Sequence, residues 1–235
     1  MLERLSSTYT ADSLYRLYES CVCIVGLGGG GCVLAELLAR HGVGNFILVD
    51  GDTYDDSNKN RQLYAVDSTL GQNKAKVAAQ RLQDINPRIR TVVHPEFISE
   101  SNYAKILYDF ESMIPAVVCD AVDGSHNKSM LADFCQRFDL PYTTGGCGGY
   151  YGWTAPIHRP NEISTRDLLG TKGIRVEDID KSMSPSPSPT TVFIQAALQA
   201  QETINMILER DWNTEGKRIG MNLMSYALSV VQVPS

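Results

Sequence analysis

Cys23-Ile24-Val25-Gly26-Leu27-Gly28-Gly29-Gly30-Gly31 is the stretch that decides the fold, because an apolar run opens directly into glycines. Residues 21–25 have the pattern of a buried parallel strand, and the Leu- and Ala-rich residues 34–40 have that of a helix packed on the sheet. Gly26 and Gly28 permit close approach of the backbone to a phosphate, and Gly31 permits close helix–strand packing. The helix N-terminus then offers free N–H groups to an anion. This combination is typical of a nucleotide site.

The next apolar run, residues 46–49, ends in Asp50, about 20 residues beyond the turn, where a ribose-binding acid is expected. A GxGxxG pattern alone also arises for structural reasons, so the acid strengthens the interpretation. Further strands are indicated at residues 90–94, 116–123 and 140–144. We therefore expect an α/β fold, Rossmann-like and doubly wound, with a mainly parallel sheet and helices on both faces.

Composition limits the class of protein. The 235 residues, 43% hydrophobic and 20% charged, suit one globular domain, and the formal charge of -6 argues against a broad nucleic-acid surface. The six cysteines form no CxxC pair, so no zinc site is expected. Nothing resembles a signal peptide, and no apolar run approaches the ~18 to 20 residues of a membrane span. We expect a cytoplasmic, reduced protein without a membrane partner.

The chain divides by pattern into four parts of one domain. Residues 1–19 suggest an N-terminal helical lid, and residues 20–152 the nucleotide-binding core. Residues 153–189 are rich in Pro and Ser and predict an extended crossing loop. Residues 190–235 predict a C-terminal helix, begun by Ser188 and Pro189, and one or two closing strands.

Two positive side chains follow the second strand, at the sheet edge where open α/β sheets bind ligands. Arg61 is a candidate to neutralise phosphate oxygens, and Asn58 and Gln62 can form hydrogen bonds there. The alternative is a solvated polar loop. Lys74 begins a predicted helix, where a lysine opposes the helix dipole, and phosphate binding would explain that position.

An acid and a thiol lie near the same predicted edge. Asp123 comes just beyond the fourth strand and could hold Mg²⁺ between phosphates; the alternative is that it caps the helix predicted over residues 128–138. Cys147 is the one cysteine outside an apolar run, in a glycine-rich stretch. A reactive role and an incidental one both remain open for this thiol.

Taken together, the motifs resemble the adenylation domain of the ubiquitin-activating (E1-like) superfamily, which includes ThiF-, MoeB- and HesA-type enzymes. The residues that carry the resemblance are Gly26-x-Gly28-Gly29-x-Gly31, Asp50-x-Asp52, Ser57-Asn58-x-Asn60-Arg61-Gln62, Gly71-x-x-Lys74 and Asp120-x-x-Asp123. The N-terminal two thirds are most similar to the tRNA threonylcarbamoyladenosine dehydratase branch.

The resemblance implies use of ATP and Mg²⁺ to convert a carboxylate into an acyl-adenylate with release of pyrophosphate. It implies that Asp50 binds the ribose hydroxyls, that Lys74 binds the α-phosphate, and that Asp123 binds the magnesium. Phosphate contacts are implied for Asn58, Arg61 and Gln62. Arg4 matches an arginine that reaches into the neighbouring subunit's site, which implies a homodimer. The loop over 159–189 lacks the cysteine that thioester-forming relatives carry.

Four functions stay open at this point. The first is activation of the Gly-Gly tail of a ubiquitin-like sulfur carrier protein, and the second is activation of a small carboxylate, as in the iron-guanylylpyridinol cofactor pathway. The third is the tRNA dehydratase reaction, which the negative charge disfavours. The fourth is an NAD(P) enzyme or a non-catalytic nucleotide sensor, but Arg61 and Lys74 suit a triphosphate better.

Overall fold

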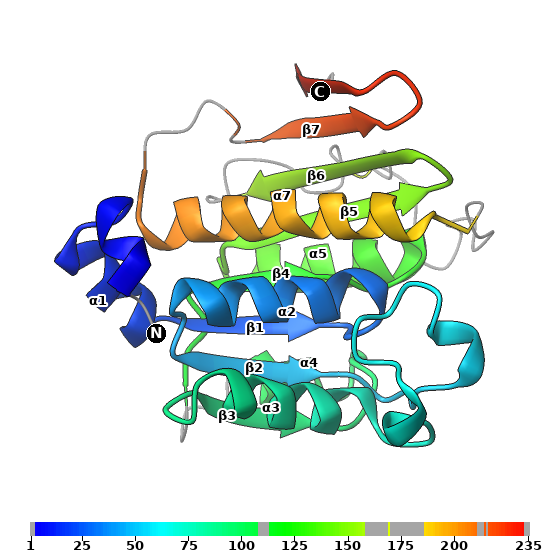
Figure 1. The fold of residues 1–235 in the computed structure, drawn as a ribbon, viewed down its shortest axis with the longest axis horizontal. Coiled ribbons are helices and arrows are strands. Elements are labelled where there is room, and N and C mark those ends of the chain that lie inside the picture. The colour runs from blue at the N-terminus through cyan, green and yellow to red at the C-terminus, as the bar shows by residue number, and fades with distance from the viewer. Residues whose placement is uncertain are drawn as a thin grey trace.

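One mixed sheet organises the part of the chain that the computed structural model describes, namely residues 3–107, 113–157, 169, 186–210, 214 and 216–232. Its strands run in the order β3-β2-β1-β4-β5-β6-β7-β8 (Figure 1). Their bounds are β1 Cys21–Val25, β2 Asn45–Val49, β3 Arg90–His94, β4 Val117–Asp120, β5 Tyr142–Gly148, β6 Tyr151–Ile157, β7 Lys217–Asn222 and β8 Ala227–Gln232. Strands β1 to β5 pair in parallel, whereas β5 to β8 pair antiparallel.

The parallel half reverses its direction of growth between β1 and β4, because the chain first builds β2 and β3 on one side and then β4 on the other. Ligands of open α/β sheets bind at such a switch point, outside the carboxyl ends of the strands. All five residues of β1 are buried, as expected for a central parallel strand. The predicted α/β, Rossmann-like class is confirmed.

Helices cover both faces of the sheet. Helices α2 (Gly29–His41), α3 (Lys74–Ile85) and α7 (Pro189–Ile207) share one apolar cluster with one face, and α4 (Tyr103–Leu107) and α5 (Ser125–Arg137) share a second cluster with the other. Three short 3₁₀ helices, η1 Glu3–Ser7, η2 Asp56–Asn58 and η3 Asp67–Thr69, complete the described helical elements. Among the described helices, none is long and apolar enough to cross a membrane.

The N-terminal segment, η1 and α1 (Ala11–Glu19), lies at the amino end of the strands, beside the last turn of α7 (Figure 1). Arg16 of α1 donates hydrogen bonds to the carbonyl oxygens of Ile207 and Leu208, at 2.9 and 3.4 Å, and pairs with Glu209. Cations at a helix C-terminus satisfy its free carbonyl groups. The expected helical lid therefore packs against α7, at the end of the sheet away from the glycine turn.

The expected crossing loop does not begin at Trp153, because β6 continues to Ile157. Thr154, Ala155 and Ile157 are fully buried and continue the antiparallel pairing with β5, so this pairing, rather than the flanking Pro and Ser, determines the boundary. The remainder of that prediction, residues 158–168 and 170–185, lies outside the described residues. Helix α5 begins at Ser125, three residues before the predicted start, with Gly124 as its N-cap.

Candidate active site

A cavity of about 1400 Å³ opens at the carboxyl ends of the parallel strands. Its walls come from the glycine turn, the loop after β2, the β4–α5 connection, the end of β5 and the start of α7, and the β7–β8 hairpin extends it. A cavity of this size accommodates a nucleotide together with a second substrate. Of the predicted site residues, nine line it: Gly26, Gly28, Gly29, Asp50, Asp52, Arg61, Gln62, Lys74 and Asp123.

The glycine turn connects β1 to α2 through two positions that tolerate no side chain. Gly26 has φ 92°, and a Cβ there would lie 2.6 Å from the carbonyl oxygen of Ala121. A Cβ on Gly31 would overlap the carbonyl oxygen of Gly26, so Gly31 serves helix–strand packing and lies outside the cavity lining. Gly28 caps α2 without a side chain, which leaves the first N–H groups of α2 available to an anion.

Asp50 is held rigidly at the end of β2. Its carboxylate accepts hydrogen bonds from the backbone N–H groups of Leu27, at 2.6 Å, and Asp52, at 2.9 Å. Burial raises the pKa of Asp50 above its ordinary value, although these hydrogen bonds oppose the shift. Asp50 thus fixes the glycine turn relative to the loop after β2.

Lys74, 5% exposed, begins α3, and its ammonium lies 2.6 Å from Asp52 Oδ2. Burial disfavours the charged carboxylate of Asp52, but the hydrogen bond and charge of Lys74 outweigh burial and lower the pKa of Asp52. Asn73 is the N-cap, and its side chain accepts a hydrogen bond from Lys76 N–H. The ion pair with Asp52 fixes the position of the Lys74 ammonium at the cavity wall.

In the polar loop after β2, some of the predicted site residues line the cavity and one does not. Arg61 lines the cavity and donates hydrogen bonds to Ser57 O and Asn60 Oδ1. Gln62 also lines it and is 7% exposed, yet within the described residues its Oε1 accepts no hydrogen bond. Asn58 is buried outside the cavity lining, and its Oδ1 accepts from Asp55 N–H in the capping of η2. The phosphate contact expected of Asn58 stays a prediction.

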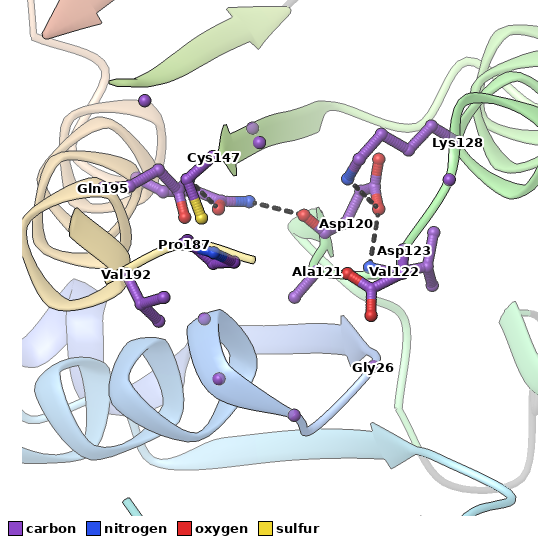
Figure 2. A pocket seen from close by; sticks show the side chains of 18 of the residues that line it. Gly26, Asp120, Ala121, Val122, Asp123, Lys128, Cys147, Pro187, Val192 and Gln195 are labelled. Carbon is purple, nitrogen blue, oxygen red and sulfur yellow. Dashed lines mark hydrogen bonds and ion pairs between the residues drawn. The ribbon is translucent and has the colours of Figure 1, made fainter. Parts of the chain in front are cut away.

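Two carboxylates, Asp120 at the end of β4 and Asp123 on the connection from β4 to α5, lie in opposite environments (Figure 2). Asp120 is fully buried and accepts hydrogen bonds from Tyr142 at 2.6 Å, Thr144 at 2.7 Å and Val122 N–H at 3.0 Å. The side chain of Asp123 is exposed into the cavity, and among the described residues no hydrogen bond or ion pair occupies its carboxylate. Since Gly124 is the N-cap of α5, Asp123 does not cap that helix.

The sequence did not point to three cavity residues that the structure reveals. Lys128 of α5 pairs with Asp120 at 3.2 Å. Gln195 of α7 donates to Gln199 Oε1 at 3.0 Å, and Gln199 donates to the carbonyl oxygen of Asp120 at 3.0 Å. The sequence carries a signal for the glutamines, because polar residues recur every four positions along one stripe of α7, at Thr191, Gln195, Gln199 and Thr203, and all four are buried.

Cys147 lies near the end of β5, beside Gln195 (Figure 2), and lines the cavity. Burial and the charge of Asp123 raise the pKa of this thiol, while the charges of Lys128 and Arg61 oppose the shift. Within the described residues, no three His, Cys, Asp or Glu side chains cluster to hold a metal ion. Arg4 is exposed on η1 and does not line the cavity.

Comparison with known proteins agrees with this geometry, since the family model described as ThiF family matches residues 3–235. The chain belongs to the ThiF family. It is 35% identical to the tRNA threonylcarbamoyladenosine dehydratase of Escherichia coli, over 69% of this chain and 57% of the relative. The dehydratase of Haemophilus influenzae is 38% identical over 69% and 59%. The molybdopterin-synthase adenylyltransferase of Haemophilus influenzae is 28% identical over 95% and 89%.

Solved structures confirm the fold of this ThiF-family chain. The Escherichia coli MccB structure with MccA-N7isoASN aligns with a TM-score of 0.79 at 21% identity, over 94% of this chain and 66% of MccB. The MccB structure with ATP aligns with a TM-score of 0.76. The chain thus spans less than two thirds of the dehydratases that it matches, and the predicted resemblance to the E1-like superfamily is confirmed.

Proposed function

We propose that this ThiF-family chain is an ATP- and Mg²⁺-dependent adenylyltransferase that activates a carboxylate as an acyl-adenylate and releases pyrophosphate. One observation carries the proposal. A single cavity brings Arg61 and Lys74 together with the open N-terminus of α2 and with the carboxylate of Asp123, which has no partner within the described part of the chain. This set matches what a triphosphate and its metal need, because cations and backbone donors stabilise the phosphate charges.

The reaction requires positioning and charge stabilisation more than a side-chain nucleophile. A carboxylate oxygen of the substrate attacks the α-phosphorus in line, and the bond to the bridging oxygen breaks, so pyrophosphate leaves with the electron pair. Negative charge on the phosphate oxygens is stabilised by Lys74, Arg61 and the α2 N–H groups. Gln62 adds an amide at the same wall, and Asp50 accepts the ribose hydroxyls.

Asp123 suits a magnesium site built largely from phosphates. Mg²⁺ in nucleotide sites is bound through one or two carboxylates, with phosphate oxygens and waters as its other ligands. The Asp123 side chain is exposed in the cavity and free of protein partners among the described residues. When bound there, Mg²⁺ would neutralise part of the phosphate charge.

We further propose that the protein works as a homodimer in the cytoplasm. Arg4 lies on η1, at the end of the sheet away from the cavity (Figure 1), and this position supports a role in a neighbouring subunit's site rather than in that of its own chain. The described cysteines are all free, which fits a reducing compartment.

The first candidate substrate is the C-terminal Gly-Gly of a ubiquitin-like sulfur carrier protein. The near full-length match to a molybdopterin-synthase adenylyltransferase supports this candidate. The dehydratase reaction on tRNA is the second candidate, supported by the higher identity to those enzymes, although the charge of -6 disfavours a polyanion. A small carboxylate is the third.

ATP–pyrophosphate exchange tests these proposals. The purified protein is given ATP, Mg²⁺ and, separately, a Gly-Gly-tailed carrier, a panel of small carboxylates, or tRNA. Exchange with one of these identifies the substrate class. ATP binding without any exchange would reject the three named substrates, and absence of ATP binding would reject the nucleotide site.

A further inference from the structure

Lys128 adds a positive charge to the cavity from a different helical layer than Lys74. It lies in the first turn of α5, on the face of the sheet opposite α2 and α3, and lines the cavity at 9% exposure. A lysine near a helix N-terminus opposes the helix dipole, and burying its ammonium removes water from a charge. The position therefore requires a compensating interaction.

Asp120 supplies only part of that compensation. Its Oδ1 lies 3.2 Å from the ammonium of Lys128, but the same oxygen also accepts from Val122 N–H. Its Oδ2 accepts from the hydroxyls of Tyr142 and Thr144. Three neutral donors already stabilise the carboxylate, so Asp120 would remain satisfied without a lysine.

The ammonium of Lys128 has hydrogen-bond donors that Asp120 does not use. An ammonium carries three N–H groups, and within the described residues Nζ makes one hydrogen bond, to Asp120. A buried donor left without an acceptor is costly. Because Lys128 lines the cavity, its remaining N–H groups can donate there to water or, when a ligand displaces that water, to an oxygen of the ligand.

The place of Lys128 indicates which part of the ligand it meets. Lys74 lies at the start of α3, beyond the loop after β2, whereas Lys128 pairs with Asp120 at the end of β4 (Figure 2). Lys128 is near enough to Cys147, close to the end of β5 on the same cavity, for its charge to lower the pKa of that thiol, against the larger effect of burial. Gly146 and Gly148, also on the lining, leave that strand end without side chains. The space beside Lys128 thus suits the acyl part of an adenylate, while the α2 N-terminus suits its phosphate.

Resting on the adenylation proposed above, we propose that Lys128 binds the carboxylate of the acyl substrate and then the carbonyl oxygen of the acyl-adenylate. It donates hydrogen bonds and transfers no proton. Lys128 would therefore orient the attacking carboxylate, whereas Arg61 and Lys74 bind the phosphates. Replacement of Lys128 should therefore weaken binding of the acyl group and leave binding of the nucleotide unchanged.

Calorimetric titration with two probes separates these roles. AMP reports nucleotide binding alone, and adenosine 5′-sulfamate acylated with glycylglycine is a stable analogue of a Gly-Gly adenylate. In Lys128→Met we expect the affinity for the acylated analogue to fall about tenfold to a hundredfold, the range of a hydrogen bond to a charged group. The affinity for AMP should change by less than about twofold.

Two further variants control for charge and folding. Lys128→Arg keeps the cation and should recover most of the affinity for the analogue. Lys76→Met removes an exposed lysine from the first turn of α3, outside the cavity, and should change neither affinity. If Lys128→Met unfolds, the double variant Asp120→Asn/Lys128→Met removes both buried charges and should show the same selective loss.

Several outcomes would overturn the inference. An equal loss of both affinities would make Lys128 a phosphate ligand or a purely structural residue, and an unchanged affinity for the analogue would remove it from the site. A wild-type protein that binds AMP but not the analogue would also reject the acyl contact, while leaving the nucleotide site intact. A wild-type protein that binds no nucleotide would reject the proposed function itself.

Discussion

Asp120 ends β4, Asp123 lies three residues later on the connection to α5, and their replacement by alanine should have different consequences. Asp120→Ala removes a fully buried carboxylate, whereas Asp123→Ala removes an exposed one that has no partner among the described residues. We expect the first variant to lose stability and the second to lose activity.

The magnitude follows from the contacts of Asp120. Removing one partner of a buried ion pair costs about 3–5 kcal/mol, because the other charge remains buried, here that of Lys128. The hydroxyls of Tyr142 and Thr144 also lose their acceptor, so we expect a total of at least about 4 kcal/mol. For Asp123→Ala the change should lie within about 0.5 kcal/mol, as for an exposed residue.

Urea and thermal unfolding measure both variants against the wild type. For a domain of this size, a loss of about 4 kcal/mol lowers Tm by roughly 8–16 °C. Asp123→Ala should keep the wild-type Tm while pyrophosphate exchange is abolished. A loss below about 1 kcal/mol in Asp120→Ala would refute the interpretation of Asp120 as a structural centre, and normal exchange in Asp123→Ala would remove Asp123 from the mechanism.

Three further predictions concern other sites. Arg61→Ala should lower the exchange rate by about a hundredfold or more through lost phosphate stabilisation, and a twofold loss would contradict that role. Cys147→Ser should leave the exchange rate unchanged, because adenylation needs no thiol. Loss of exchange in this variant would show that the thiol takes part in adenylation. The carboxylate of Glu36 is buried and accepts hydrogen bonds from Arg81 and Arg40. Burial opposes the charged form, but these arginines outweigh it and lower the pKa of Glu36. Its stabilisation should therefore be complete above the ordinary value of 4.5 and be lost as pH falls through the folded pKa. Acid unfolding curves of wild type and Glu36→Gln should diverge above that range and converge below it.

The parallel half of the fold could be predicted because each element carries a local signal. Strand β1 is an apolar run followed directly by Gly26, and β3 matches the predicted bounds of residues 90–94. Lys74 could be predicted as a site residue because a positive charge is unfavourable at the N-terminus of a helix, where the helix dipole is also positive. Such signals depend on a few neighbouring residues, so they can be interpreted without knowledge of tertiary contacts.

The antiparallel half was harder to predict for a physical reason. Strand β5 contains Gly145, Gly146 and Gly148, which have low strand propensity. A Cβ on Gly145 would lie 2.7 Å from the carbonyl oxygen of Trp153 in β6 and would overlap the amide of Gln195 in α7, 50 residues away in the sequence. Lys128 was not predicted for a different reason, because its role depends on an ion pair with Asp120 of β4 that forms only when α5 packs against the sheet. Local propensity cannot report such contacts.

Helix α7 makes the order of synthesis matter for this chain. Ala196, Ala200 and Ile204 belong to the same buried cluster as Leu34, Ala35 and Leu38 of α2, and Arg16 bonds to the last turn of α7. A ribosome-bound chain that ends before residue 189 would expose this apolar face of α2, however complete its glycine turn. The nucleotide site should therefore form fully only after α7 has left the exit tunnel, and until then we expect the apolar face of α2 to be exposed to aggregation or to chaperone binding.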